Sequence, residues 1–329
     1  MTSDHRAFDS TTGPCSLPYC TYPRARDVAQ HGLQALPELL PRVDLAQAHP
    51  YRSRQYTPIA AKRLAATQVL EMARVMATSF ARREPMARHL QPPKYPPAEL
   101  LKVRHTDPFG TEPFGPWSTG TLLYWFIRLL VLTDPASPRS SIQLNTEALA
   151  QSLAIVDPTG QVIGAALNAP MPPLDAQPEL RRDDPFLSAV LMFVEPVLTL
   201  LSAQDAAALI ALGTQYPPFR VAYAQRRVGH HFMVARSDAL AKAHTFELVA
   251  ATAAHYQALR YAFVVVEATN QWTGAACERL GGVRVHFAPY QAQATVPQSS
   301  GPLEGTVTSR NGFLSDKDSG SMFYVIRLT

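Results

Sequence analysis

Apolar positions along this chain follow two different spacings. In segments such as AKAHTFELVAATAAHYQALR they return every three or four residues, which is typical of an amphipathic helix. In YAFVVVEA they follow one another over a short stretch, which is typical of a buried strand. Segments of the two kinds alternate from residue 57 onward, so the pattern predicts an α/β protein.

The first half of the chain predicts two helices. Thr57 is expected to cap the first, with Pro58 at its first position, and the apolar spacing continues to about Arg83. The second lies in the apolar segment 119–133, which is too short to cross a bilayer and carries Arg128 at its centre. We therefore expect a buried helix there and no membrane partner.

Two more helical stretches are expected between residues 183 and 213, as spacers or lids. The second begins at Ser202, and Ser202 with Asp205 resembles a capping box. Ahead of them, SLAIVDPTGQVIGAAL predicts a hairpin, because residues 157–160 supply turn residues between two apolar runs. Strands are also expected in VGHHFMVARS, in YAFVVVEA, after the short helix that follows Asn270, and in the terminal SMFYVIRLT.

The expected organisation is one domain over residues 57–329 preceded by an arm. Residues 1–56 are rich in Pro and polar residues, with LQALPELLPRV as the only expected helical turn. The Pro- and Gly-rich segment 92–117 is expected to be a covering loop, and the polar stretch of about thirty residues before the last strand is expected to be mobile or functional.

Composition narrows the class of protein. The net charge is +4 and the sequence pI about 9.0, but Lys and Arg are scattered, so no nucleic-acid partner is expected. Three cysteines are too few for a disulfide framework and indicate a reducing compartment. Cys15 and Cys20 lack partners at zinc spacing, so no metal is expected. The start of the chain lacks a secretory pattern, and a cytoplasmic location is expected.

The segment VVVEATNQWTGAACERLGGVRV resembles a motif of the GCN5-related N-acetyltransferase superfamily. There a strand ends at an asparagine and a short helix follows with a pattern like N-x-x-A-x-x-x-Y-x-x-x-G-F. Asn270, Thr273, Cys277, Gly281 and Gly282 occupy those places, and three of the side chains differ. The predicted hairpin, which ends in a small residue, is also similar, and the likeness in element order covers about residues 57–329. It implies a mixed central sheet flanked by helices and acyl transfer from acetyl-coenzyme A.

The resemblance also implies where the cofactor binds. Two parallel strands that splay apart expose backbone groups that can pair with the pantetheine arm, and a helix N-terminus can take the pyrophosphate. Leu240 stands where the superfamily has an arginine, and small residues replace its glycines. The alternative for this segment is an ordinary helix start. The residues expected to bind the cofactor are Met233, Val234, Ala235, Ala241, Lys242, Ala243, His244, Thr245 and Asn270.

On the acceptor side, SFARREPMARHL resembles the F-x-x-x-E-P-[LM] stretch of arylalkylamine N-acetyltransferases. The resemblance implies that Glu84 is the general base, and an amine that is protonated at neutral pH needs one before it can attack a thioester. The alternative is a solvated carboxylate flanked by Arg82, Arg83 and Arg88.

Three more residues are candidates for proton transfer. His230 and His231 are adjacent on a predicted strand, so alternation sends them to opposite faces and only one can line the cleft. A buried histidine without a catalytic part is the alternative for each. Cys277 falls where many members of the superfamily have an acidic tyrosine, and could protonate the leaving thiolate. Its alternatives are a packing role and, less favoured, a covalent acyl carrier.

The sequence therefore predicts an acyl-coenzyme A-dependent N-acyltransferase, most simply an acetyltransferase acting on the amine of a small molecule. Tyr95, Phe109, Phe114 and Trp117 hint at an apolar or aromatic acceptor. One alternative is a non-catalytic binding module of the same fold with a degenerate cofactor loop. Another is an acyltransferase for a protein or natural-product amine, or one that uses a longer acyl chain.

Overall fold

The computed structural model describes residues 33–43, 45, 56–85, 87, 90, 118–133, 142–172, 185–240, 243–289 and 320–329. Several sequence-based expectations lie outside these residues. They are the covering loop 92–117, the polar stretch before the last strand, the two N-terminal cysteines, and Ala241 and Lys242 of the expected cofactor loop.

Seven strands form one mixed sheet in the order β1-β2-β3-β4-β5-β7-β6. Only β4 and β5 pair in parallel; every other neighbouring pair is antiparallel. The C-terminal strand β7 lies between β5 and β6, so the end of the chain is built into the sheet. The strands are β1 (Ile59–Ala60), β2 (Leu153–Val156), β3 (Val162–Pro170), β4 (Val228–Arg236), β5 (Phe263–Ala268), β6 (Val283–Pro289) and β7 (Gly320–Arg327).

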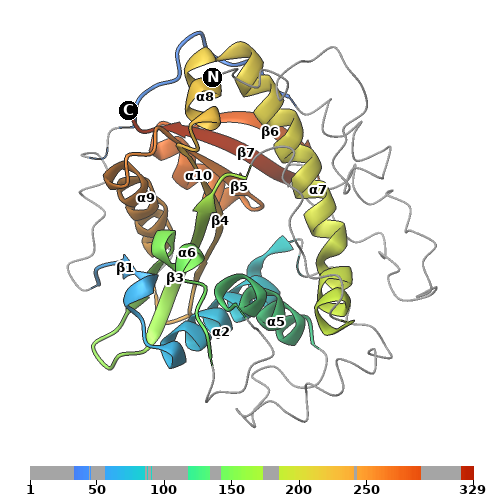
Figure 1. The fold of residues 1–329 in the computed structure, drawn as a ribbon, viewed down its shortest axis with the longest axis vertical. Helices are drawn as coiled ribbons and strands as arrows, with labels where there is room; N and C mark the ends of the chain where they lie inside the picture. The colour runs from blue at the N-terminus through green and yellow to red at the C-terminus, as the bar shows by residue number, and fades with distance from the viewer. Residues whose placement is uncertain are drawn as a thin grey trace.

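Helices cover both faces of this sheet (Figure 1). On one face, α2 and α5 pack side by side against the half of the sheet around β3, and the end of α7 with α8 packs against the other half. On the opposite face, α9 covers β2 to β4 and α10 covers β5 to β7. The helices are α2 (Ala66–Arg83), α5 (Thr119–Val131), α6 (Thr146–Gln151), α7 (Pro185–Gln215), α8 (Pro217–Ala224), α9 (Ala243–Ala258) and α10 (Gln271–Arg279).

The expected fold class, a mixed central sheet flanked by helices (Figure 1), is confirmed. The chain crosses between its single parallel pair through α9, and the last two strands return antiparallel. The predicted hairpin is also confirmed. Asp157 Oδ1 accepts hydrogen bonds from the backbone N–H groups of Thr159 and Gln161, which closes the turn between β2 and β3.

The predicted start of the first helix was wrong. Ile59 and Ala60 form β1 and pair with β2, and α2 begins at Ala66. Strand pairing outweighs the local capping signal of Thr57 and Pro58 here. At the actual start, Gln68 stands in for a capping side chain, since its Oε1 accepts from the Ala65 N–H at 3.0 Å.

Two other helix predictions were wrong. The stretches expected between residues 183 and 213 are one helix, α7, of 31 residues, so Ser202 and Asp205 lie in its interior instead of capping a second helix. The helical turn expected in the arm is not formed. Residues 33–43 run beside the sheet instead, with isolated bridges from Leu33 to His286 and from Arg42 to Arg327.

The predicted buried helix at residues 119–133 is confirmed as α5. Arg128 is 1% exposed, and its guanidinium lies 4.3 Å from the ring centroid of Trp125. Stacking on aromatic rings compensates in part for the removal of the guanidinium from water. Among the described residues, no helix is both long and apolar enough to cross a membrane.

A glycine at the start of β4 lets α9 lie close to the sheet. A Cβ added to Gly229 would lie 2.5 Å from Cε1 of Tyr256, a fully buried residue of α9. The Tyr256 hydroxyl donates to the carbonyl oxygens of Ala169 on β3, at 2.7 Å, and His230 on β4, at 3.0 Å. The tyrosine thus ties two strands together beside the parallel pair.

We expect Gly229→Ala to lower the free energy of unfolding by about 1–3 kcal/mol, because the added methyl group forces the Tyr256 ring out of its place. Urea denaturation measures the change. A Tyr256→Leu background serves as the control, since removal of the ring should make the added methyl group much less costly. An unchanged denaturation midpoint in Gly229→Ala would contradict the close contact.

Candidate active site

The parallel pairing of β4 and β5 ends in the middle of the sheet. Its last pair is His231 with Val266, whereas β4 continues to Arg236 and β5 to Ala268. Beyond that pair, the facing edges of the two strands are released from each other. Such released edges carry backbone N–H and C=O groups that a ligand can pair with.

A β-bulge in β4 lies at the same point. The pairing with β3 passes from Leu167 opposite Met233 to Asn168 opposite His231, which leaves Phe232 without an opposing residue. Strict alternation would send Phe232 and Met233 to opposite faces, but both line one pocket. The bulge therefore turns a second apolar side chain toward this pocket.

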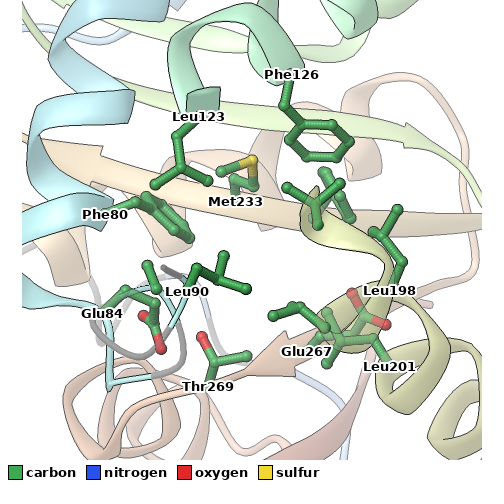
Figure 2. Close-up of a pocket in the computed structure, with 14 residues that line it drawn as sticks. Phe80, Glu84, Leu90, Leu123, Phe126, Leu198, Leu201, Met233, Glu267 and Thr269 are labelled. Carbon is green, nitrogen blue, oxygen red and sulfur yellow. The ribbon is translucent and has the colours of Figure 1, made fainter. Parts of the chain in front are cut away.

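The pocket lies between the end of α2, the middle parts of α5 and α7, and the released strand edges, and its empty volume is about 540 Å³ (Figure 2). Most of its wall is apolar. Glu84, Glu267 and Thr269 lie along one side, opposite Phe80, Leu123 and other apolar side chains. The lining residues are Phe80, Glu84, Ala87, Leu90, Leu123, Phe126, Val194, Val197, Leu198, Leu201, Phe232, Met233, Glu267 and Thr269.

Glu84 is one of the two carboxylates in this pocket. It is the residue that ends α2, and it is 6% exposed, so the alternative of a solvated carboxylate is wrong. Asn270 Nδ2 donates to Glu84 Oε2 at 3.0 Å. The same asparagine caps α10, because its Oδ1 accepts from the Thr273 N–H at 3.0 Å. One side chain therefore ties the start of α10 to the end of α2.

Glu267 is the other carboxylate, and it belongs to a buried cluster with Asp205 of α7 and His230 of β4. Glu267 Oε2 lies 3.3 Å from His230 Nε2. Burial opposes ionisation of Glu267, but the charge of His230 and hydrogen bonds from His230 and Asp205 outweigh it and keep its pKa below the usual value. Burial and the nearby Glu267 charge raise the pKa of Asp205 well above its usual value. The protonated form of Asp205 is therefore favoured, and it can donate a hydrogen bond to Glu267.

The same three side chains could hold a metal ion. One ligand atom from each of Asp205, His230 and Glu267 lies within 4.8 Å of the other two. An imidazole nitrogen with two carboxylate oxygens suits a divalent transition metal.

The two adjacent histidines point to opposite faces, as predicted. His230 lies on the face that α7 covers, beside Glu267. His231 lies on the face that α9 covers and is 1% exposed, and its Nδ1–H donates to Asn168 Oδ1 at 2.7 Å. Burial and the neighbouring His230 lower the pKa of His231 to about 3. His231 therefore stays neutral and belongs to the core.

Cys277 lies apart from the pocket. It is fully buried in α10, in the apolar cluster between α9, α10 and the sheet. Burial, with a smaller effect of Glu278, raises the pKa of its thiol. A thiol in this position packs the helix against the strands, in agreement with the packing alternative.

The residues expected to bind the cofactor are placed in two groups. Met233, Val234 and Ala235 lie on β4 beyond its last pair with β5. His244 and Thr245 lie in the first turn of α9, as does Ala243 at its first position. Leu240, which stands where the superfamily has an arginine, is 2% exposed and packs over Gly164, where a Cβ would lie 2.9 Å from Leu240 Cδ1.

Sequence reasoning missed Glu267 and Asp205. The signal for Glu267 is a lone carboxylate inside the apolar run FVVVEA, which is costly to bury without partners. Asp205 gave no such signal, because an aspartate three residues after a serine has an ordinary interpretation as a helix cap. Its contact with Glu267 depends on how α7 crosses the sheet.

The burial of His231 makes stability depend on pH. In the unfolded chain His231 takes up a proton near pH 6.5, whereas in the folded chain it does so only near pH 3. The unfolded state binds more protons between these values, so folding stability should fall as pH falls through this window. His231→Gln keeps a donor for Asn168 and removes the titrating group. We expect it to reduce the loss of stability between pH 6.5 and pH 3 in urea denaturation.

The same variant measured at pH 8 is the internal control, because the imidazole is neutral in both states there. Its free energy of unfolding at pH 8 should differ from that of the wild type by no more than about 1–2 kcal/mol, the cost of an altered buried side chain. If His231→Gln lost as much folding stability between pH 6.5 and pH 3 as the wild type, His231 would not be the group that causes the acid sensitivity.

Neither protein-family models nor curated protein sequences give a match to this chain. A comparison with solved structures gives distant matches. The C-terminal condensation domain of Ebony in complex with beta-alanyl-dopamine is 13% identical, with 83% of this chain and 99% of that chain covered, at a TM-score of 0.49. Arylalkylamine N-acetyltransferase 2 from Aedes aegypti is 11% identical, with 83% and 99% covered, at 0.44. Drosophila melanogaster polyamine N-acetyltransferase is 17% identical, with 61% and 87% covered, at 0.36. At such low scores and identities the likeness carries no argument about activity.

Proposed function

We propose that this protein is an acyl-coenzyme A-dependent N-acyltransferase that transfers an acyl group, most simply acetyl, to the amine of a small molecule. The observation that supports this proposal is that three features of the structure meet at one point of the sheet. The released edges of β4 and β5, an apolar pocket and a buried carboxylate, Glu84, meet where the parallel pairing ends.

The released strand edges suit the pantetheine arm of the cofactor. The arm carries amide groups, which can pair with the backbone of Met233, Val234 and Ala235 as a neighbouring strand would. Its thioester end then points toward the pocket, because Met233 is both the first of these residues and part of the pocket wall. The start of α9, with Ala243, His244 and Thr245, is the proposed position of the pyrophosphate, where free backbone N–H groups favour anions.

The pocket suits an acceptor with an apolar body and one amine. Aromatic rings of Phe80, Phe126 and Phe232 supply much of its wall, and its acidic groups lie along one side. An ammonium group is drawn to a carboxylate in a pocket with few other polar groups, while the apolar body gains by leaving water. A small arylalkyl or alkyl amine fits these properties.

Glu84 is proposed as the general base. Its carboxylate accepts a proton of the bound ammonium, directly or through a water molecule, and the freed amine attacks the thioester carbonyl. The C–S bond then breaks, the nitrogen loses its second proton to form the amide, and the coenzyme A thiolate takes up a proton and leaves as the thiol. Asn270, which lies just beyond the end of β5, donates a hydrogen bond from Nδ2 to Glu84 Oε2. This contact fixes the orientation of the Glu84 carboxylate. His230, paired with Glu267, is the second candidate for proton transfer, since it lies on the pocket face of the sheet.

Acetyl-coenzyme A should raise the melting temperature of the protein, because a ligand that binds only the native state stabilises it. The protein should then transfer the acetyl group to a primary amine on an apolar body, with the corresponding alcohol as an unreactive control. Thermal denaturation and a thiol-release assay measure the two effects. Stabilisation without turnover on any amine would favour the non-catalytic module, and absence of both would reject the proposal.

Glu84→Gln keeps the size of the side chain and its contact with Asn270 but removes its basicity. We expect turnover to fall by about two to four orders of magnitude while cofactor affinity stays near that of the wild type. Raising the pH should restore part of the rate, because more of the amine is then already deprotonated. Steady-state kinetics across pH and cofactor titration measure these effects.

Glu147→Gln is the matched control, since Glu147 is an exposed carboxylate in the first turn of α6 and lines no part of the pocket. It should leave turnover unchanged. Full activity in Glu84→Gln would show that Glu84 is not the base, and His230 would then have to take that role.

A further inference from the structure

A second cavity, with an empty volume of about 660 Å³, lies beside the loop that joins β4 to α9. Its walls come from the C-terminal half of α2 and from the end of β4 with the residues that follow. Unlike the acceptor pocket, it is rich in guanidinium groups. The lining residues are Arg74, Val75, Thr78, Ser79, Arg82, Arg83, Arg236, Ser237 and Asp238.

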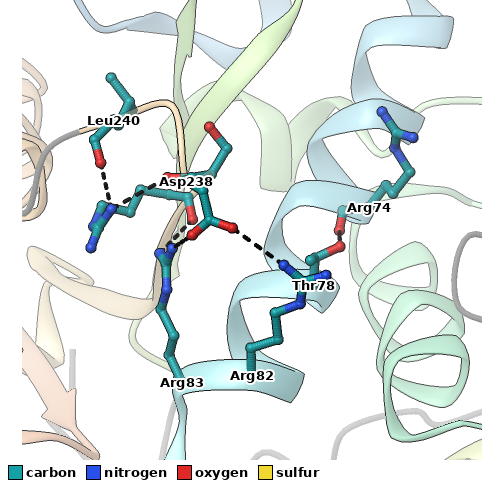
Figure 3. A network of polar contacts seen from close by, with 8 residues as sticks. Arg74, Thr78, Arg82, Arg83, Asp238 and Leu240 are labelled. Atoms are coloured by element: carbon teal, nitrogen blue, oxygen red, sulfur yellow. Dashed lines mark hydrogen bonds and ion pairs between the residues drawn. The ribbon is translucent and has the colours of Figure 1, made fainter.

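Arg82 and Arg83 converge on one loop, whereas the side chain of Arg74 points away from it (Figure 3). Arg82 and Arg83 extend from the end of α2 and both pair with the carboxylate of Asp238. Arg83 also donates to the backbone oxygen of Arg236 at 2.9 Å, and the Arg236 guanidinium donates to the backbone oxygen of Leu240. The end of α2 is thereby attached to the first residues after β4.

Among the described residues in and beside this cavity, positive charge exceeds negative charge. The lining has four guanidinium groups and the carboxylate of Asp238, and a second carboxylate, that of Glu71, pairs with Arg74 at 3.6 Å. Burial and the nearby Arg83 lower the pKa of Arg236, as expected where cations crowd together. The Asp238 side chain is 73% exposed, so solvent screens its attraction for the arginines and an anion could compete with it.

We propose that Arg74, Arg82 and Arg83 of α2, with Arg236 of β4, bind the phosphate groups of the acyl-coenzyme A cosubstrate. The proposal rests on the acyltransferase function proposed above and adds the residues that would recognise the cosubstrate's anionic end. Guanidinium groups bind phosphate oxygens through paired, charge-assisted hydrogen bonds, and an excess of two positive charges matches a pyrophosphate.

The position of the cavity supports this assignment. Arg236 is three residues beyond Met233, so about 10 Å of extended strand separates the acceptor pocket from the arginines. A pantetheine arm laid along β4 from the pocket therefore runs toward them. The loop beside them lacks the arginine and glycines of the superfamily pattern, and the arginines of α2 supply cations beside the place where this chain lacks that arginine.

The cluster also lies next to the proposed base. Arg83 is the last residue of α2 and Glu84 is the residue that follows it, so one helix end carries a phosphate contact and the base. Cosubstrate bound to Arg83 would hold this helix end in place. The binding of one substrate would then help to position the group that activates the other.

The test compares acetyl-coenzyme A with S-acetylpantetheine, which has the same thioester arm and no phosphate. In Arg82→Gln/Arg83→Gln we expect the KM for acetyl-coenzyme A to rise by about tenfold or more, because charge-assisted hydrogen bonds to phosphate are lost. The KM for S-acetylpantetheine should change by less than about twofold. Raising the salt concentration should weaken binding of acetyl-coenzyme A to the wild type more than to the variant.

Two single variants keep the test valid if the double variant folds poorly. Arg74→Gln leaves the contacts of Arg82 and Arg83 with Asp238 intact and should still raise the KM for acetyl-coenzyme A selectively. Arg63→Gln removes an exposed arginine before α2 that lies outside the cavity, and should leave both KM values unchanged. Inorganic pyrophosphate should raise the melting temperature of the wild type and of Arg63→Gln more than that of Arg74→Gln.

The outcomes separate this proposal from the proposed function. Normal turnover with an unchanged KM for acetyl-coenzyme A in the arginine variants would overturn the phosphate site and leave the acyltransferase function standing. An equal rise in KM for the two thioesters, or an equal effect of Arg63→Gln, would overturn it as well. A wild type that binds pyrophosphate but neither thioester would reject the proposed function, and with it the assignment of the anion as coenzyme A.

Discussion

The end of the parallel pairing at His231 and Val266 is the constraint on which the rest of the site depends. Where this pairing ends, the two strands keep their other partners, because β3 still pairs with β4 and β7 still pairs with β5. The bulge at Phe232 widens that place. The apolar pocket, the carboxylate of Glu84 and the arginine cavity all lie around the strand edges released there.

The two carboxylates of the pocket are held in different ways. Glu267 lies beside His230 of β4 and Asp205 of α7, and these neighbours keep its pKa below the usual value despite its burial. Glu84 is held by the neutral amide of Asn270, which orients a carboxylate without adding a positive charge. An orienting contact of this kind suits a group that must gain a proton in each turnover.

Much of the fold could be predicted from the sequence, because periodicity and turn residues are local signals. The hairpin at Asp157 and the buried helix around Arg128 are examples. The failures come from contacts between distant segments: Ile59 is extended because β2 lies beside it, and α7 is continuous because it packs across the sheet. No local pattern records these neighbours, so a plausible cap at Thr57 gave a wrong helix start.

The same reason limits prediction of the site. Sequence reasoning treated Glu84 and Asn270 as parts of two unrelated motifs, a base and a cofactor contact, yet the structure joins them across 186 positions by a 3.0 Å hydrogen bond. The asparagine at the end of the apolar strand thus has two structural tasks: it caps α10, and it fixes the carboxylate that ends α2. Because both tasks use the same side chain, a change at Asn270 would alter the start of a helix and the orientation of Glu84 together. The position tolerates few other residues for that reason, since a carboxylate could cap the helix but would repel Glu84, and a serine is too short to do both.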